Sequence, residues 1–453
     1  MPDARRTALT ILNILDQKQT TLDHVMEEMH AENAEAFRRD RALTNALVYG
    51  VVRWRGKLDW IIHHFSRTPL KKIDSNILNV LRIGVFQLLY MDRIPDSAAV
   101  NTSVELAKPE SPVWVIQYIN GLLRNVARHH HDVSFPSVHN DPVDSIAASK
   151  SFPRWLIEKW IARFGIEETV AMCDAVNIIP PITLRTNTLK ISKEKLKETL
   201  SEEVESISPT IYSPYGLTVR GPKTAIPKLS AFQKGWFQVQ DEAAQLVAML
   251  ANPNPEETIL DACAGLGGKT AHLAQMMGNR GHIVAMDSNR KKLDKLESEM
   301  NRLGIKTVET CQHDLSSPPS KNRLGMFDCI LLDAPCSGLG VIRRNPDIKW
   351  SESKKNLIKY QQKQILFLSN LSHLVKPGGR MIFAVCSTEQ EENESVIESF
   401  LTTHSGFRIH DRCESLPVQK PSILYQQNGL KTYPHLHGMD GFFSVCIKRP
   451  ASC

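Results

Sequence analysis

Residues 258–270 read Thr-Ile-Leu-Asp-Ala-Cys-Ala-Gly-Leu-Gly-Gly-Lys-Thr, a short apolar run that leads into a glycine-rich turn. This pattern predicts a buried strand from Thr258 to Cys263 followed by a ligand-binding loop. The loop is not a P-loop, which would need a glycine at Cys263, and a dinucleotide fingerprint counted from Gly265 would need glycine or alanine at Thr270. The stretch therefore predicts an α/β sheet but leaves the ligand open.

Around this stretch, predicted strands alternate with predicted helices. The strands are 258–263, 282–287, 307–311, 327–332, 380–385 and 442–447, and the intervening helices include 272–277, 290–303 and 357–374. Such alternation is typical of a mostly parallel sheet with helices on both faces. Ligand sites in these sheets lie in the loops after the strand ends.

Acidic side chains follow the predicted strands where those loops begin. Asp287 closes the second strand, where a carboxylate can accept hydrogen bonds from both hydroxyls of a ribose. Asp314 lies just after the third strand, where it can accept from an adenine amino group. Each carboxylate alone could be merely solvated, but together with the glycine loop they predict a nucleoside site that needs no pyrophosphate.

Two cysteines stand at the ends of the next two strands. Cys336 lies in Asp333-Ala334-Pro335-Cys336-Ser337-Gly338, and Cys386 lies in Val385-Cys386-Ser387-Thr388. Neighbouring strands would bring both thiols into one crevice although they are 50 positions apart. A buried structural role is the usual one for cysteine, and we assign it to Cys263, Cys329 and Cys446, which lie within strand patterns.

The first 130 residues show only helical periodicity. Ile77, Val80, Leu81 and Val85 repeat at helical spacing behind a start signal at Asp74-Ser75. Residues 96–107 form a shorter predicted helix between Pro95 and Lys108-Pro109. Three histidines, 129–131, could suggest a metal, but consecutive helix positions face different ways and cationic groups favour a helix C-terminus. We predict an all-helical bundle.

A linker and a small mixed region are expected next. Residues 132–150 contain Pro136, Pro142 and many small polar residues, which is typical of a linker. A helix around residues 155–164 and a strand over 182–187 predict an α+β region. Arg185 and Asn187 on that strand could bind a phosphate or a base edge of RNA, or could simply be solvated on an edge strand.

Composition sets outer limits. Of the 453 residues, 42% are hydrophobic and 23% charged, and no apolar run approaches the roughly 20 residues that span a bilayer. A net charge of +6 permits nucleic-acid binding without requiring it. The nine cysteines include no CxxC pair and no zinc spacing, so we expect reduced thiols in a cytoplasmic protein without a metal.

The motifs as a set resemble the RNA cytosine-5 methyltransferases. They comprise residues 261–270, the run 333–340 that continues into Arg343-Arg344-Asn345-Pro346-Asp347-Ile348-Lys349-Trp350, and Cys386-Ser387-Thr388 with Glu391-Glu392-Asn393-Glu394. The N-terminal motifs around Tyr49-Gly50, Arg82-Ile83-Gly84, Asp92-Arg93 and Asn120-Gly121 resemble the NusB-type RNA-binding domain. Nearly end to end, the chain is similar to the RsmB (Sun, Fmu) enzymes, although it has Gly265-Leu266 where that family usually has Ala-Pro and Val385 where Thr is common.

This resemblance implies a multidomain chain. It has an all-α NusB-like RNA-binding bundle (1–140), a linker with a small α+β RNA-binding region (141–252) and a Rossmann-like class I methyltransferase domain (253–453). S-adenosyl-L-methionine would be held by Cys263, Ala264, Gly265, Leu266, Gly267, Gly268, Lys269, Asp287, Asp314 and Asp333. Cys386 would be the nucleophile, Cys336 would help to release the product, and Asp333 would contact the base.

The substrate that the resemblance implies is 16S ribosomal RNA, with cytosine 967 as the family target, methylated at carbon 5 by a monomeric enzyme through a covalent cysteine adduct. Two alternatives stay open. Nothing in the catalytic motifs separates ribosomal RNA from transfer RNA as the substrate, and the helical region alone would also suit a non-catalytic RNA-binding or transcription-associated protein.

Overall fold

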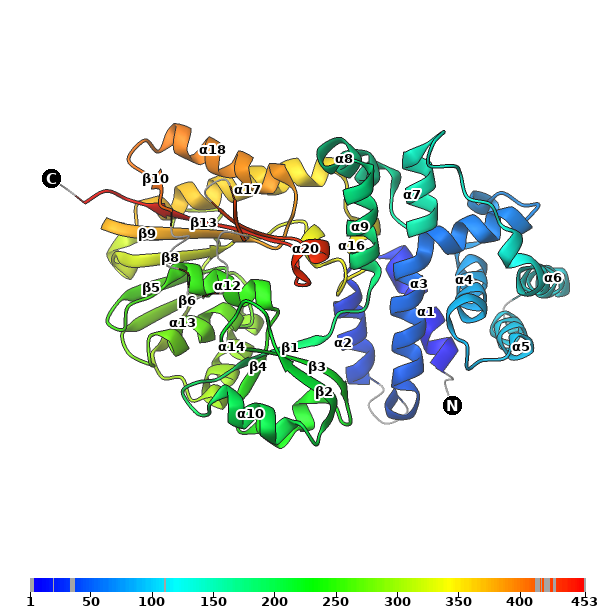
Figure 1. Cartoon of the computed structure of the whole chain (residues 1–453), viewed down its shortest axis with the longest axis horizontal. Coiled ribbons are helices and arrows are strands. Elements are labelled where there is room, and N and C mark those ends of the chain that lie inside the picture. The colour runs from blue at the N-terminus through cyan, green and yellow to red at the C-terminus, as the bar shows by residue number, and fades with distance from the viewer. Residues whose placement is uncertain are drawn as a thin grey trace. The chain divides into compact units, whose positions relative to one another are not determined.

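The computed structural model describes residues 4–18, 20–32, 37–109, 111–411, 416, 418, 424–426 and 429–451. Within these residues, no helix is long and apolar enough to cross a membrane. The chain divides into two compact units, one of Met1–Ile178 with Ile342–Ser351 and one of Ile179–Val341 with Glu352–Cys453. The short segment 342–351 therefore packs with the N-terminal unit although it lies late in the sequence (Figure 1).

The first unit is helical throughout its described part, as the sequence predicted. Its helices are α1 (Ala4–Gln17), α2 (Leu22–Glu32), α3 (Phe37–Phe65), α4 (Ser75–Tyr90), α5 (Asp96–Ala107), α6 (Val113–His129), α7 (Pro142–Lys150), α8 (Arg154–Phe164), α9 (Ile166–Asn177) and the single turn α16 (Ile348–Ser351). The predicted start of α4 is confirmed, because the Asp74 side chain accepts hydrogen bonds from the Asn76 and Ile77 amides. The three histidines lie at the end of α6 and in the 3₁₀ turn His130–Asp132 that follows.

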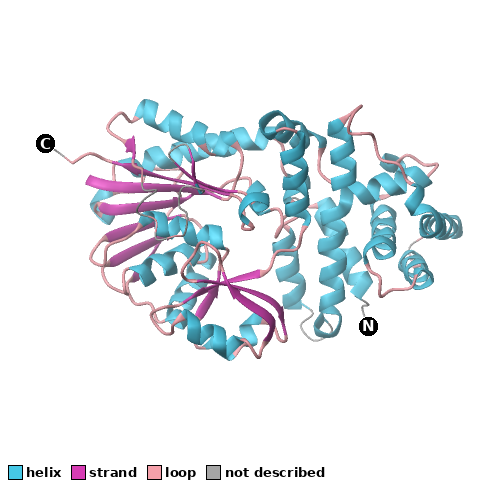
Figure 2. Ribbon diagram, viewed as in Figure 1, coloured by secondary structure: helices cyan, strands magenta, loops and turns pink. Residues whose placement is uncertain are grey.

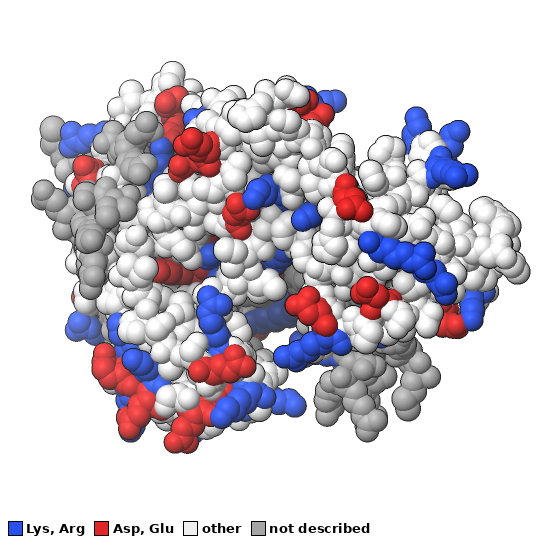
Figure 3. Space-filling model, turned by 45° about the vertical axis from the view of Figure 1, so that its right-hand side comes forward, with Lys and Arg blue, Asp and Glu red and all other residues white. Residues whose placement is uncertain are grey.

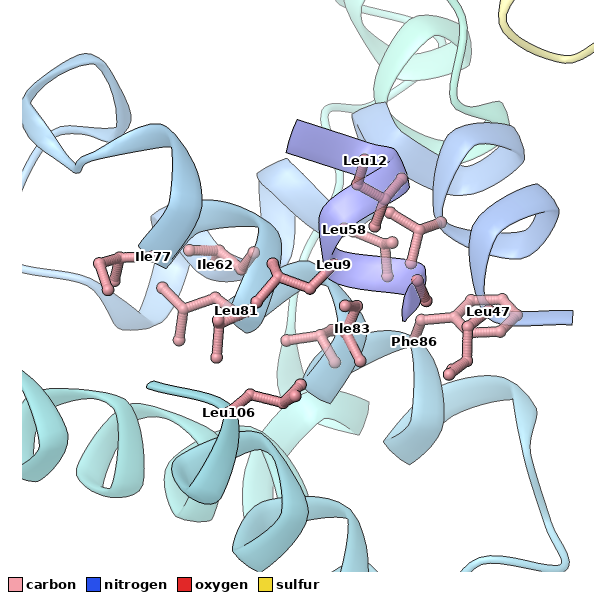
Figure 4. Packing of buried hydrophobic residues seen from close by; sticks show 14 of the residues in the cluster. Leu9, Leu12, Leu47, Leu58, Ile62, Ile77, Leu81, Ile83, Phe86 and Leu106 are labelled. Atoms are coloured by element: carbon pink, nitrogen blue, oxygen red, sulfur yellow. The ribbon is translucent and has the colours of Figure 1, made fainter. Parts of the chain in front are cut away.

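Apolar side chains from α1, α3, α4 and α5 meet in one core. Figure 4 shows Leu9 and Leu12 of α1 directed toward Leu58 of α3, with Ile83 of α4 beside them. Close approach between α3 and α4 depends on Gly50, because a Cβ there would lie 2.0 Å from the Phe86 ring. Helical spacing of apolar residues therefore produced the bundle that the sequence indicated.

The predicted linker is wrong in its second half. Residues 142–150 form α7, which begins with Asp141 as N-cap, accepting from the Asp144 amide at 2.9 Å, and with Pro142 in the first turn. Asp followed by Pro suits a helix start as well as it suits a turn. The proline that suggested a linker is here the first residue of a helix.

The second unit opens with a small antiparallel sheet. Its strands are β1 (Ile182–Thr186), β2 (Val204–Pro209), β3 (Gly216–Pro222) and β4 (Phe237–Val239), in the order β2-β3-β1-β4, with α10 (Lys193–Leu200) and the turn α11 (Ser230–Gln233). Helix α10 begins after Ser192, whose side chain caps it by accepting a hydrogen bond from the Lys195 amide at 3.2 Å. Mixed α+β structure was the correct prediction for this region.

A larger sheet forms the rest of the unit (Figure 2). Its strands are β5 (Thr258–Ala262), β6 (His282–Asp287), β7 (Val308–Gln312), β8 (Phe327–Asp333), β9 (Val375–Val385), β10 (Arg408–Ile409), β11 (Tyr425–Gln426), β12 (Gly429–Thr432) and β13 (Phe442–Lys448). The order is β11-β12-β13-β9-β8-β5-β6-β7, and β10 pairs with β13. Strands β5 to β9 run parallel, whereas β12 and β13 are antiparallel additions. The carboxyl ends of β5, β6, β8 and β9 thus share one edge.

Helices cover both faces of this sheet, as predicted. The helices are α12 (Glu242–Ala251), α13 (Gly268–Met276), α14 (Arg290–Leu303), α15 (Lys321–Leu324), α17 (Lys354–Ser372), α18 (Glu394–Thr403) and α20 (Pro434–His437). Leu246, Leu273 and Leu296 of α12, α13 and α14 pack in one core. Leu368 and Phe400 of α17 and α18 pack in another, on the opposite face (Figure 1).

Charged side chains are mixed in sign over the face drawn in Figure 3, where basic and acidic groups lie next to one another. This distribution agrees with a net charge of only +6. Charge on this face therefore does not by itself mark a nucleic-acid surface.

Candidate active site

The glycine-rich loop turns sharply away from β5. Cys263, Gly265 and Gly267 all have positive φ values, of 77°, 58° and 81°. The Cys263 and Ala264 amides donate to the Met286 carbonyl of β6 at 2.9 and 2.8 Å, which fixes the start of the loop. Cys263 therefore lies in the loop and is half-buried, so the prediction that it is a buried strand cysteine is wrong. Cys329 and Cys446 are buried within β8 and β13, as expected.

The remaining loop residues leave room for a ligand. A Cβ at Gly265 would meet nothing within 4 Å, and the Leu266 side chain is 54% exposed. A Cβ at Gly267 would instead lie 2.6 Å from Leu296, so glycine is needed there for packing against α14. One side of the loop, at Gly267, thus packs against α14, whereas the side at Gly265 has free space next to it.

Three carboxylates surround the loop at the strand ends. Asp287 accepts from the Gly265 amide at 3.0 Å and from the Asn289 amide at 2.9 Å. Asp261 is buried, and its Oδ2 accepts from the Thr270 hydroxyl at 2.6 Å, while its Oδ1 has no hydrogen-bond partner among the residues that the structure describes. Burial, together with the charges of Asp333 and Asp287, raises the pKa of Asp261 to about 7.

Asp314 follows β7, the neighbour of β6, and is exposed. Its side chain accepts from the Ser316 amide at 2.8 Å, and this bond to the backbone lowers the pKa of the carboxyl. The sequence placed Asp287 and Asp314 at successive strand ends, and the strand order puts them on adjacent strands. That position leaves Asp314 accessible to a ligand.

Lys269 and Asp333 form an ion pair. Lys269 lies in the first turn of α13, and its Nζ is 2.6 Å from Oδ2 of Asp333 at the end of β8. Burial alone would lower the pKa of Lys269, but the charge and hydrogen bond of Asp333 outweigh it and raise that pKa. A thiolate at Cys386 would add to the same effect, so the ammonium lies within electrostatic reach of that sulfur.

The two site cysteines lie side by side. The Sγ atoms of Cys336 and Cys386 are 3.3 Å apart, each just beyond the end of its strand. The pairing of β8 with β9 produces this meeting, since Asp333 aligns with Ala384 and the Gly340 amide donates to the Cys386 carbonyl at 3.0 Å. The hydrogen bond with Cys386, followed by burial, raises the pKa of the Cys336 thiol.

Sequence reasoning assigned no role to Glu392, which the structure places next to both cysteine loops. Its carboxylate accepts from Ser337 and from Ser387, the residues that follow Cys336 and Cys386. The only signal in the sequence was a run of acidic residues after Thr388. Nothing in that run shows that it is Glu392 whose carboxylate contacts both cysteine loops.

Arg185 and Asn187 are neither solvated nor directed at a partner outside the chain. Arg185 is 1% exposed on β1, which lies between β3 and β4, and donates to the Gly268 carbonyl at 2.7 Å and to Gln238 at 2.8 Å. Asn187 donates to the carbonyls of Gly235 and Leu303 at 2.8 and 2.9 Å. Both alternatives offered for these side chains were therefore wrong, because the small sheet packs against α13 and α14 of the larger sheet and uses these donors internally.

The residues fit S-adenosylmethionine. That molecule carries a sulfonium cation, an ammonium group, ribose hydroxyls and an adenine amine, all of which favour carboxylate partners. The carboxylates of Asp287 and Asp333 outnumber the single ammonium of Lys269, and Oδ1 of Asp261, which accepts no hydrogen bond from the residues that the structure describes, adds an acceptor. The open side of Gly265 gives a ligand access to the loop.

Comparisons with known proteins agree with this geometry. Residues 248–448 match the family described as 16S rRNA methyltransferase RsmB/F, residues 2–128 the NusB family, and residues 152–225 the RsmF/B-like ferredoxin-like domain. "Probable ribosomal RNA small subunit methyltransferase B" of Synechocystis sp. is 35% identical over 99% of this chain and 100% of its own. The protein of the same name from Bacillus subtilis is 32% identical over 98% of each chain.

A solved structure supports the fold over the same length. The crystal structure of PH0851 shares 26% sequence identity, covers 99% of each chain and has a TM-score of 0.79. Since identity above 30% extends over nearly the whole of both curated relatives, the similarity is not confined to one domain. The chain therefore belongs to the RsmB/F family of 16S rRNA methyltransferases.

Proposed function

We propose that this chain transfers a methyl group from S-adenosylmethionine to carbon 5 of a cytosine in 16S ribosomal RNA, with cytosine 967 as the target that the family resemblance implies. The observation that carries the proposal is the 3.3 Å approach of two cysteine sulfur atoms beside an ion pair of Lys269 and Asp333. One sulfur can form a covalent bond to a base while the other assists its release.

Carbon 5 of cytosine is too weak a nucleophile to take a methyl group unaided. We assign the attacking thiolate to Cys386, whose Sγ would add to carbon 6 and so make carbon 5 electron-rich. Lys269 supports the negative sulfur, since a positive charge near a thiol favours its thiolate form. S-adenosylmethionine, when bound, supplies the methyl group that carbon 5 accepts.

Cys336 is suited to the second half of the reaction. Its raised pKa keeps that sulfur protonated while Cys386 is the nucleophile. Because it lies beside Cys386, it is also next to the bond between Cys386 and carbon 6 that must finally break. Once Cys386 is bonded to carbon 6, its negative charge no longer raises the pKa of Cys336, which can then lose its proton to water. We assign to the Cys336 thiolate the removal of the carbon 5 proton. The electron pair of that C–H bond restores the double bond between carbons 5 and 6, the pair of the C–S bond returns to Cys386 as thiolate, and the methylated base leaves.

Asp333 contributes at the base edge. Its side chain is 33% exposed, while Lys269 on its other side is 12% exposed, so the carboxylate keeps an accessible face. There it can accept from the exocyclic amine of cytosine or from a protonated ring nitrogen as positive charge develops. The loop residues 263–269, Asp287 and Asp314 are the proposed holders of the cofactor.

The target base has to leave its stack to reach Cys386, which costs a few kcal/mol and least in a loop. We assign RNA holding to the NusB-like helices and to the small sheet. Arg185 and Asn187 are excluded from that task because both are buried. The residues of these regions that touch RNA are therefore to be sought among exposed groups.

The test is methylation of purified, unmodified 16S ribosomal RNA and, in parallel, of bulk transfer RNA by the full chain with S-adenosylmethionine. Bisulfite sequencing should show one new protected cytosine in the ribosomal RNA. Cys386→Ala should abolish the product, whereas Cys336→Ala should accumulate protein linked to RNA, visible as a shifted band on a denaturing gel. Cys311→Ala, on the edge strand β7, is the matched control and should behave as wild type.

Each arm has a contrary outcome. Methylation of transfer RNA alone would show that transfer RNA, and not 16S ribosomal RNA, is the substrate. A Cys386→Ala enzyme that methylates at near the wild-type rate would contradict the covalent mechanism. If neither RNA gains 5-methylcytosine with the wild-type chain, the proposed activity is wrong.

A further inference from the structure

Glu392 is a completely buried carboxylate between the two cysteine loops. It lies in the 3₁₀ turn Gln390–Glu392, and its Oε1 accepts from the Ser337 amide at 2.7 Å. Its Oε2 accepts from the hydroxyls of Ser337 and Ser387, each at 2.5 Å. The two hydroxyl oxygens are themselves 3.4 Å apart.

This carboxylate therefore joins the two cysteine loops through a hydrogen-bonded serine on each of them. Ser337 is bonded directly to Cys336 in the chain, and Ser387 directly to Cys386. Hydrogen bonds to an ionised acceptor are short and about twice as strong as neutral ones, so three of them restrict both serines closely. The separation of the neighbouring sulfur atoms is restricted with them.

Packing alone does not explain a carboxylate here. Burial raises the pKa of Glu392, and the hydrogen bonds from the serines only partly oppose that effect. The hydrogen-bond partners described for its carboxylate, which also include Gln364 at 3.4 Å, are all neutral. A buried charge without a cation is costly, and perturbed carboxyl groups of this kind concentrate at functional sites.

The charge also acts on one of the sulfur atoms. Besides Cys386 and burial, the negative charge of Glu392 contributes to raising the pKa of Cys336. It thus helps to keep Cys336 protonated while its neighbour is the nucleophile. The same group can in this way fix both the spacing and the order of protonation of the two thiols.

We propose that Glu392 is a positioning residue of the methyl-transfer reaction, which holds the Cys336 and Cys386 loops at working distance through Ser337 and Ser387. The proposal rests on the two-cysteine function given above. It predicts that the side chain matters to turnover and to the titration of Cys336, and matters little to cofactor binding, since its contacts are with the cysteine loops.

The test compares full-length wild type with Glu392→Gln, which has the same size without the charge, and with Ser387→Ala, which removes one hydrogen bond and keeps the charge. Glu392→Gln should lower kcat on 16S ribosomal RNA at least tenfold and leave the KM for S-adenosylmethionine within twofold. Alkylation of Cys336 by iodoacetamide, followed against pH by mass spectrometry, should have its midpoint shifted to lower pH. Ser387→Ala should lower kcat several-fold and leave that midpoint unchanged.

Glu398→Gln is the control, because Glu398 is an exposed carboxylate on the nearby α18 and should leave all three readouts as in wild type. A kcat within twofold of wild type in Glu392→Gln would overturn the proposal. So would a lower kcat that comes with a lower melting temperature but no shift of the alkylation midpoint, since that describes a purely structural residue. If Glu392→Gln does not fold, Ser387→Ala decides, and wild-type turnover in it overturns the proposal. Absence of any methylation by wild type would instead contradict the proposed function itself.

Discussion

At the scale of single residues, Asp261 is the carboxyl group whose protonation the fold most clearly alters. It lies near the end of β5, 1% exposed, and Asp333 and Asp287 are charged neighbours. In the described part of the chain, its Oδ1 has no hydrogen-bond partner. These surroundings favour its neutral form and raise its pKa from 3.8 to about 7. Ionising the Asp261 carboxyl group therefore costs free energy in the folded chain.

We predict that this group makes stability fall with rising pH. Between pH 4 and 7 the folded state keeps a proton that the unfolded state has lost, so the free energy of unfolding decreases as pH rises through that window. About three units of pKa correspond to a cost on the order of 4 kcal/mol above pH 7. In urea unfolding at pH 5 and 7.5, the stability of wild type relative to Asp261→Asn should decrease with pH. Asp294→Asn, at an exposed position of α14, should show the same change in stability between the two pH values as wild type. The prediction is contradicted if the stability of Asp261→Asn changes between pH 5 and 7.5 by as much as that of wild type.

At the scale of elements, strand β1 supports the start of helix α13. The buried Arg185 of β1 donates from one nitrogen to the Gly268 carbonyl at the first residue of α13 and to Gln240, and from another to Gln238. Burial lowers the pKa of Arg185 to about 9, because the charged form loses its hydration. The three hydrogen-bond acceptors offset part of that free-energy cost. The glycine loop immediately precedes Gly268, so the small sheet stabilises the loop that we assign to the cofactor.

We predict that Arg185→Met loosens that loop. Loss of the guanidinium leaves three buried acceptors without this donor, which should lower the free energy of unfolding by about 3 kcal/mol. The dissociation constant for S-adenosylmethionine, measured by isothermal titration calorimetry, should rise about tenfold because the loop no longer has a fixed end. Arg220→Met, an exposed arginine on β3, should leave both quantities unchanged. Cofactor affinity equal to wild type in folded Arg185→Met protein would show that β1 does not support the loop.

Much of the site could be predicted because its signals are local. A glycine loop after an apolar run, acids at Asp287 and Asp333, and cysteines after two strands are each visible within a few residues. Parallel pairing then brings Cys336 beside Cys386, which the strand pattern implied.

What the sequence did not reveal depends on contacts between distant segments. One prediction for Arg185 was a solvated side chain, on the assumption that its strand lies at the edge of a sheet. The structure places β1 between β3 and β4, and a sequence does not show whether a strand has one neighbour or two. Glu392 is distinguished from the adjacent acids only by the direction of its side chain. The domain boundaries at residues 140 and 252 remain predictions.

At the scale of the whole molecule, the segment 342–351 packs in the helical unit although its neighbours in the chain on both sides belong to the other unit. It follows the Cys336 loop in the chain by only a few residues, yet it belongs to the helical unit. The Leu22 amide donates to Asp347 at 3.0 Å, and Trp350 Nε1 donates to the Val52 carbonyl at 2.7 Å. The loop that bears Cys336 is therefore continuous with a segment anchored among α2, α3 and α9.

Lys349 is the centre of that anchor. It is 0% exposed, and its Nζ donates to the carbonyls of Arg53 and Ser151 at 3.2 and 3.1 Å and to Oδ1 of Asn177 at 2.7 Å. The ammonium also lies 3.7 Å from the centre of the Phe152 ring. Burial lowers the pKa of Lys349 well below its ordinary value, and the three hydrogen-bond acceptors offset part of the free-energy cost of burying this amino group.

We predict that Lys349→Met releases the segment, because methionine fills the space of the lysine stem but leaves three acceptors unsatisfied. A loss of about 3 kcal/mol in the local opening free energy should make amide exchange of residues 342–351 faster by about a hundredfold. Hydrogen–deuterium exchange with mass spectrometry measures this directly, and peptides from β5 and β6 in the other unit should exchange as in wild type.

Turnover on 16S ribosomal RNA should fall in the same variant, since the segment that follows the Cys336 loop in the chain is no longer fixed. Lys359→Met, an exposed lysine on α17, should change neither measurement, and unchanged exchange of residues 342–351 in Lys349→Met would show that the anchor lies elsewhere.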